Sequence, residues 1–73
     1  MEQSNAVKAL AAIAHDGRLS LIRHLIQAGP TGLAAGALAR LAQISNSTLS
    51  AQLLTLANAG LVSSQRQLSL IHI

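Results

Sequence analysis

The 73-residue sequence contains no cysteine, no phenylalanine, no tryptophan and no tyrosine. Without cysteine, neither a disulfide framework nor a zinc–thiolate site can support the fold. The absence of aromatic side chains also excludes the stacking platforms that bind single-stranded nucleic acid. The core therefore has to form from aliphatic residues alone, although a chain of this length buries only about 60% of its unfolded surface.

Charged residues and long apolar runs are also scarce. Five Lys and Arg residues and two Asp and Glu residues give a net charge of +3, and charged residues make up only 10% of the chain. The longest apolar run, Ala9 to Ala14, is far shorter than the roughly 20 residues that span a bilayer. No nucleophile has an obvious paired base, and no Gly-rich phosphate loop is present. We therefore expect a cytoplasmic protein that is not an enzyme, has no membrane partner and needs no cofactor or metal.

Alanine, leucine and isoleucine supply most of the hydrophobic 51% of the chain, and their spacing is helical. We expect one domain over 1–73, with helices at about 5–14, 17–28, 35–42 and 46–59. Ser4 or Asn5 is the expected N-cap of the first helix, and Asp16 that of the second. Gly29 and Pro30 are expected to end the second helix, and Thr31 to Leu33 to form a connector.

The third and fourth helices are joined by three residues, Gln43 to Ser45, a spacing typical of a helix-turn-helix. Ser45 is the expected N-cap of the fourth helix, and Gly60 its stop. Beyond Gly60 the helical spacing ends and alternation predicts strands at 61–62 and 68–73, which would form a wing over about 61–73. This order of elements predicts a mainly α fold with a small β-hairpin, the winged helix-turn-helix.

A helix-turn-helix binds DNA when its second helix lies in the major groove with polar side chains facing the bases. In the fourth helix, leucines at helical spacing provide an inner face, and polar residues cluster toward the amino end. Asn and Gln amides pair with adenine, hydroxyls bind bases or phosphates, and arginines bind phosphates. The predicted DNA-contacting residues are Arg40, Ser45, Asn46, Ser47, Thr48, Ser50, Gln52 and Arg66.

Other polar residues have two interpretations each. His15 and Asp16 are adjacent at a helix junction, a position more typical of capping than of metal binding. Arg18, on the second helix, is either a solvated surface residue or a phosphate contact. The polar residues of the fourth helix also have an alternative to DNA binding, in which they form the solvated face of a helix in a small helical bundle.

Three segments of the chain resemble the ArsR-type bacterial transcriptional repressors. Residues 11–22 (AAIAHDGRLSLI) are similar to the family's ALAHPTRLAIL, residues 45–53 (SNSTLSAQL) to its SQSTVSHHL, and residues 59–62 to its AGLV. The resemblance extends from about Asn5 to Ile73. It implies a cytoplasmic homodimer that binds palindromic operator DNA as a repressor and releases it when an inducer or metal binds.

The sequence departs from this family in three respects. It has no cysteine for a thiolate metal site, residues 63–69 contain one cation, Arg66, and the family's final helix has no counterpart before Ile73. The residues identify neither the inducer nor the operator. Double-stranded DNA and a second copy of the chain are the expected partners, because dimerisation doubles the DNA contacts and covers apolar surface of the first helix. The alternative function is a dimerisation or interaction module, derived from such a repressor, that does not bind DNA.

Overall fold

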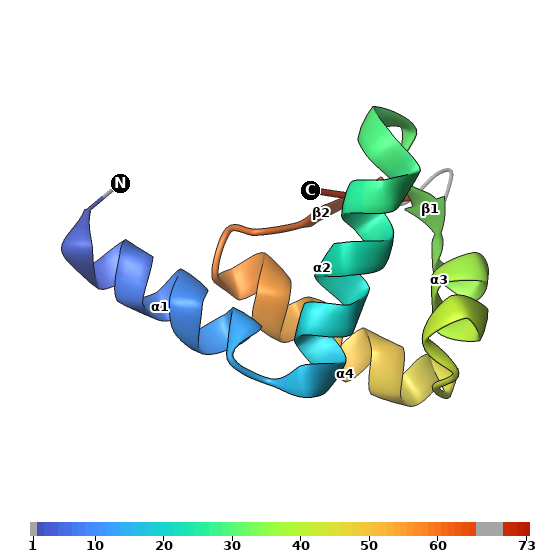
Figure 1. Ribbon diagram of the computed structural model, residues 1–73, viewed down its shortest axis with the longest axis horizontal. Coiled ribbons are helices and arrows are strands. Elements are labelled where there is room, and N and C mark those ends of the chain that lie inside the picture. Colours follow the sequence, from blue (N-terminus) through green and yellow to red (C-terminus); the bar gives the residue numbers. More distant parts are fainter. Residues whose placement is uncertain (1, 66–69) are drawn as a thin grey trace.

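The computed structural model describes residues 2–65 and 70–73 and contains helices and a small sheet (Figure 1). Each predicted helix is present, with ends within two residues of those expected. The helices are α1 (Gln3–Ile13), α2 (Asp16–Ala28), α3 (Ala35–Ala42) and α4 (Asn46–Asn58). A 3₁₀ turn, η1 (Gly29–Thr31), follows α2, and the strands are β1 (Leu33–Ala34), β2 (Ser63–Gln65) and β3 (Leu70–His72).

The caps of the first two helices differ from those predicted. Helix α1 begins earlier than expected, so Glu2 is its N-cap in place of Ser4 or Asn5. At α2 the cap is His15, whose Nδ1 accepts hydrogen bonds from the backbone N–H groups of Gly17 (3.1 Å) and Arg18 (3.5 Å). Asp16 is instead the first residue of α2, where its negative charge is favourable at the positive end of the helix dipole.

The sheet contains one strand more than the predicted hairpin. Its order is β1-β3-β2, and both pairings are antiparallel, with Leu33 opposite Ile71 and Ser64 also opposite Ile71. The segment expected to be a connector therefore ends in strand β1. Strand β2 starts at Ser63, after the predicted 61–62, and β3 occupies 70–72, while residues 66–69 lie outside the described part of the chain.

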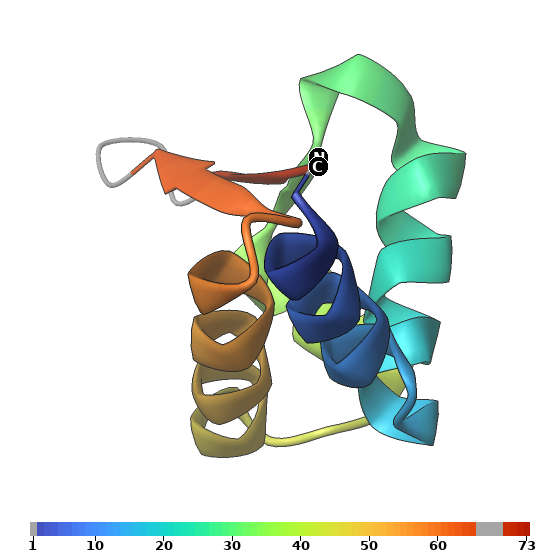
Figure 2. The same cartoon turned by 90° about the vertical axis from the view of Figure 1, so that its left-hand side faces the viewer.

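The aliphatic core lies between the helices and the inner face of the sheet. Leu21 and Leu25 of α2, Leu38 of α3 and Leu56 of α4 are fully buried. Val62 and Ile71 extend the same core to the strands. In both views of the ribbon, β2 and β3 lie above α4 (Figures 1 and 2), so the core joins α4 to the wing. No helix in residues 2–65 or 70–73 has the length and apolar character needed to cross a membrane.

Candidate nucleic-acid interface

The turn between α3 and α4 is held by backbone hydrogen bonds. Gln43 adopts a left-handed conformation (φ 58°, ψ 46°), and its N–H donates to the carbonyl of Arg40 at 3.2 Å. The next residue, Ile44, donates its N–H to the carbonyl of Ala39 at 3.1 Å. These two bonds form a Schellman stop, in which glutamine takes the position that is usually glycine. They fix the angle at which α4 leaves α3.

Helix α4 begins at the predicted cap. The Oγ atom of Ser45 accepts a hydrogen bond from the backbone N–H of Thr48 at 3.1 Å. The same hydroxyl donates to Oγ1 of Thr48 at 2.9 Å and lies 3.2 Å from Oγ of Ser47. At its other end the helix is closed by Gly60 and Leu61, whose N–H groups donate to Ala57 (2.9 Å) and Leu56 (3.0 Å). Three hydroxyl groups are thus gathered at the amino end of a helix with defined ends.

The two sides of α4 differ in chemistry. Leu49 and Leu56 are buried in the core, and Leu53 is half-buried against it. The side chains of Asn46, Ser47, Thr48 and Ser50 are exposed, as is Ser45 before them. Arg40, on α3 just before the turn, is exposed as well. The structure therefore brings six of the eight predicted residues onto the exposed surface of α3, the turn and the first half of α4.

A family model for a helix-turn-helix domain matches residues 13–65, which is more than half of the chain. The chain belongs to this helix-turn-helix family. No curated protein shows a match to this sequence. With the helices, the turn and the antiparallel strands described above, the fold is a winged helix-turn-helix, and α4 occupies the position of the helix that enters the major groove in DNA-binding members of this class.

Gln52 lies apart from the other predicted site residues of the helix-turn-helix. It is half-buried, and its Oε1 is enclosed without a hydrogen-bond partner among the described residues. Its amide lies against the start of α2: a Cβ atom at Gly17 would be only 2.5 Å from Nε2 of Gln52. In this conformation the side chain joins α4 to α2 and does not point outward. The signal for this contact in the sequence is Gly17, which leaves room for the amide.

Arg66, the predicted contact in the wing, lies outside the described residues. Arg18 has a role that the sequence interpretations did not include, because its Nε donates a hydrogen bond to the carbonyl of Ala12 and links α2 to the end of α1. Among residues 2–65 and 70–73, no three His, Asp or Glu side chains are grouped so that they could hold a metal ion.

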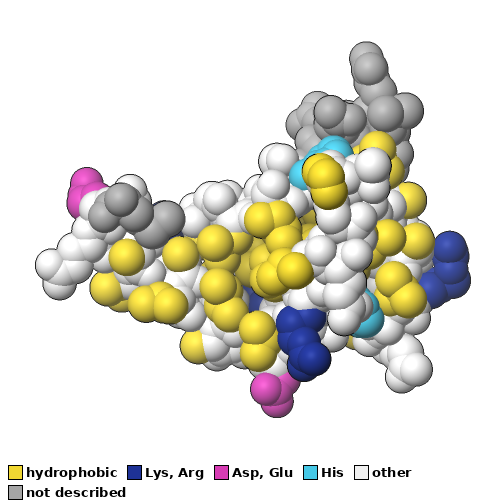
Figure 3. Space-filling view, turned by 45° about the horizontal axis from the view of Figure 1, so that its top comes forward, with side chains coloured by type: hydrophobic (Ala, Val, Ile, Leu, Met, Phe, Trp, Pro, Cys, Tyr) yellow, Lys and Arg dark blue, Asp and Glu magenta, His cyan; other side chains and the backbone are white. Residues whose placement is uncertain are grey.

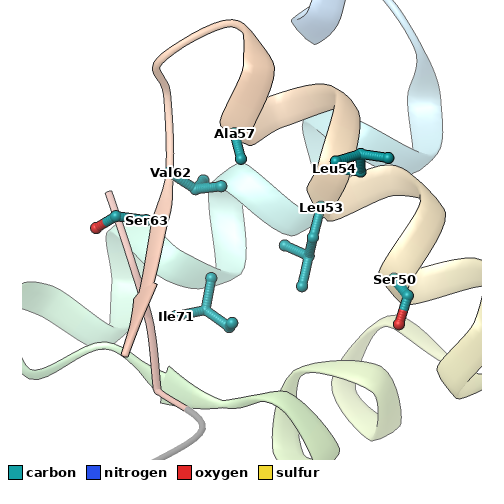
Figure 4. Close-up of a pocket in the computed structure, with 7 residues that line it drawn as sticks. All are labelled: Ser50, Leu53, Leu54, Ala57, Val62, Ser63 and Ile71. Carbon is teal, nitrogen blue, oxygen red and sulfur yellow. The ribbon is translucent and has the colours of Figure 1, made fainter. Parts of the chain in front are cut away.

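An uncharged cavity separates the second half of α4 from the strands of the helix-turn-helix domain (Figure 4). It has a volume of about 300 Å³ and is open to solvent. Leu53 and Ile71 point toward each other across it, and Leu54 lies at its rim (Figure 4). The residues that line it are Ser50, Leu53, Leu54, Ala57, Val62, Ser63 and Ile71. The surface between α4 and the wing is thus mainly apolar.

A second apolar surface lies on α1, away from the turn. Val7 is 59% exposed and Leu10 is 67% exposed. Ala11 and Ala14, which are also exposed, follow them at helical spacing on the same face. Hydrophobic side chains gather along the arm formed by α1 and continue toward the centre of the face shown in Figure 3. We call Val7, Leu10, Ala11 and Ala14 the α1 face.

Proposed function

We propose that this helix-turn-helix protein is a transcriptional repressor of the ArsR type that binds operator DNA as a homodimer. The observation that carries the proposal is the exposed polar surface at the amino end of α4, whose opposite side is anchored by Leu49 and Leu56. A helix held in this way can enter the major groove, about 12 Å wide, without losing its contacts with the core. The proposal implies a bacterial, cytoplasmic protein.

The predicted residues take different roles in this proposal. Asn46 is exposed on the first turn of α4. Its side-chain amide can donate a hydrogen bond to N7 of adenine and accept one from the N6 amino group of the same base. The hydroxyls of Ser45, Ser47, Thr48 and Ser50 bind phosphates or base edges. Arg40, on the helix that crosses the DNA backbone, binds a phosphate, and Arg66 is the second arginine assigned to phosphate binding. Gln52 reaches a base only if its amide leaves Gly17.

Homodimer formation is supported by the α1 face. Contiguous apolar surface on a small protein marks an interaction site, and two copies of the same helix face can cover each other around a two-fold axis. A two-fold dimer carries two copies of α4, which matches a palindromic operator. An inducer is part of the proposed mechanism, but its chemistry does not follow from the described residues.

Binding to DNA is the direct test. The protein would be titrated into a fluorescent duplex taken from the region upstream of its own gene, in competition with unrelated duplex. We expect preference for one sequence, and a slope of log K against log[salt] of about −4 to −5 if each protomer makes two or three cationic contacts. Asn46→Ala should lower the preference by about tenfold or more, because one bidentate base contact discriminates by ~1–3 kcal/mol.

Asn5→Ala is the matched control, since Asn5 is exposed on α1 and lies on the side of that helix opposite Val7. It should bind DNA like the unmodified protein. Equal losses in the two variants would contradict the assignment of Asn46 to the DNA surface.

The second candidate function is a dimerisation module that does not bind DNA. It is favoured by the exposed apolar α1 face and by the lack of any charged residue within Asn46–Asn58. A stable dimer with no sequence-preferring DNA binding at low salt would support this function and refute the repressor.

A further inference from the structure

We propose that α4 selects A·T base pairs by apolar contact with thymine methyl groups, with Ala51 and Leu54 as the contacting residues. This inference rests on the proposed DNA-binding function and adds the base composition of the site that α4 reads. It uses two residues that were not among the predicted DNA contacts.

The first observation is the geometry of the outermost side of α4. Leu49 and Leu56 define its buried side, being 2% and 0% exposed. Ser47, Ala51 and Leu54 follow one another at spacings of four and three residues, so they lie on one face, opposite the buried side. All three are exposed. We call these three residues the outer stripe of α4.

The second observation is the chemistry of that stripe. It offers one hydroxyl, one methyl group and one isobutyl group, and no residue of Asn46–Asn58 is charged. Guanine is read most often by the paired donors of Arg or Lys, and cytosine by the carboxylate of Asp or Glu. Helix α4 provides neither. Thymine differs from the other bases by a C5-methyl group in the major groove, which apolar side chains contact.

The third observation is the exposure of Leu54. Its side chain is 62% exposed and lies at the rim of the cavity between α4 and the strands, next to Leu53 and Ala57. The apolar surface of the outer stripe therefore continues toward the wing. A row of thymine methyl groups in the major groove complements such a surface, whereas the amino group of cytosine would lose water there without gaining a partner.

Arginine contacts from outside α4 do not alter this argument. Arg40 is on α3, and a Cβ atom at Gly36 would lie 3.5 Å from its Nη1, so its guanidinium is directed back along its own helix. The helix before the turn crosses the DNA backbone in this class of fold. A guanine contact made elsewhere would affect base pairs other than those facing α4.

The first experiment is selection of binding sites from a random duplex pool by the full chain. We expect A·T pairs at the positions that chemical footprinting assigns to α4. Enrichment of G·C pairs at those positions would overturn the inference while leaving the DNA-binding function intact. Failure to select any sequence would overturn both.

The second experiment tests the methyl contact on the selected duplex. Replacing the thymine nearest Leu54 by deoxyuridine removes only the C5-methyl group. Affinity should fall about fourfold, the equivalent of ~0.8 kcal/mol for one buried CH₂ group. Leu54→Ala should cause a loss of similar size on the thymine duplex and almost none on the deoxyuridine duplex, because both changes remove the same contact.

Leu19→Ala is the control variant, since Leu19 is a partly exposed leucine (41%) on α2. It should retain the full preference for thymine over deoxyuridine. Two results would refute the proposed contact. One is that the unmodified protein binds the thymine and deoxyuridine duplexes equally well at every position facing α4. The other is that Leu54→Ala loses as much affinity on the deoxyuridine duplex as on the thymine duplex.

Discussion

Ser45 connects the turn to the proposed DNA surface through a single hydroxyl group. Its Oγ satisfies the N–H of Thr48, which has no partner within the helix. Replacing such a cap by alanine costs about 1 kcal/mol of stability. We therefore expect Ser45→Ala to lower the free energy of unfolding by about that amount, measured by urea denaturation monitored by circular dichroism at 222 nm.

Ser50→Ala is the matched control. Ser50 is an exposed serine within the same helix, beyond the N-cap position. Alanine is the better helix former, so this variant should be as stable as the unmodified protein or slightly more stable. If both variants lost the same stability, the cap at Ser45 would not be the cause.

Single residues also show where sequence reasoning succeeds and where it fails. The cap at Ser45 was predictable because a cap depends on residues adjacent in the chain. His15 and Asp16 were both expected at a capping junction, but Asp16 was named as the N-cap because it is the commoner capping residue, and the structure gives that position to His15. Gln52 was assigned to the DNA surface from its polarity, but its orientation depends on the space beside Gly17, which lies on another helix. Gly17 leaves room for the amide, but a glycine in the sequence does not identify which side chain from another helix fills that room.

At the scale of elements, the sheet depends on a close approach between Gly32 and β3. Gly32 has a φ of +74°, and a Cβ atom there would lie 2.3 Å from the backbone carbonyl oxygen of Ile71. Neither the conformation nor the space suits another residue. We expect Gly32→Ala to lower the free energy of unfolding by about 2 kcal/mol or more, measured by thermal and urea denaturation.

The control is the same substitution at Gly36, inside α3. The nearest atom to a new Cβ there is Nη1 of Arg40 at 3.5 Å, an ordinary contact. Gly36→Ala should raise stability by about 0.5–1 kcal/mol, because alanine favours the helix. Opposite signs for the two variants are the expected result, and a stable Gly32→Ala would show that β1 does not need this approach.

A pair of leucines tests the two sides of α4 within one element. Leu56 is fully buried, and Leu54 is 62% exposed. Leu56→Ala should cost about 2–5 kcal/mol through lost burial and a cavity, whereas Leu54→Ala should change stability by less than about 0.5 kcal/mol. The measurement is the midpoint of urea denaturation for each variant. Comparable losses would mean that α4 is rotated away from the orientation that buries Leu56 and exposes Leu54.

The helices were predictable as elements because the 3.6-residue spacing of leucine and isoleucine repeats over several turns. Strand β1 was not, because two residues carry no periodicity. Leu33 and Ala34 form a strand because β3, from the far end of the chain, pairs with them. The same pairing turned the predicted hairpin into a sheet of three strands.

At the scale of the whole molecule, low charge and exposed apolar surface favour association. The net charge of +3 gives weak repulsion between copies, and Val7 and Leu10 are largely exposed on α1. A single protomer would also hold DNA through few cationic contacts. Both properties favour a dimer in which the α1 faces cover each other and two copies of α4 act on one duplex.

Leu10→Ser tests that arrangement. Burying a leucine side chain contributes ~1.5–3 kcal/mol, and a symmetric dimer loses two of them. The dissociation constant of the dimer should therefore rise more than about a hundredfold in sedimentation equilibrium.

Leu41→Ser, which changes a 53% exposed leucine on α3, is the control and should remain dimeric. The Leu10 side chain is exposed on α1 and is not part of the proposed DNA surface. The variant protomer should therefore still bind a half-site as the unmodified protomer does, and should lose the advantage of a full palindrome. If Leu10→Ser stayed dimeric and Leu41→Ser dissociated, the interface would lie on α3 instead, beside the surface proposed to bind DNA.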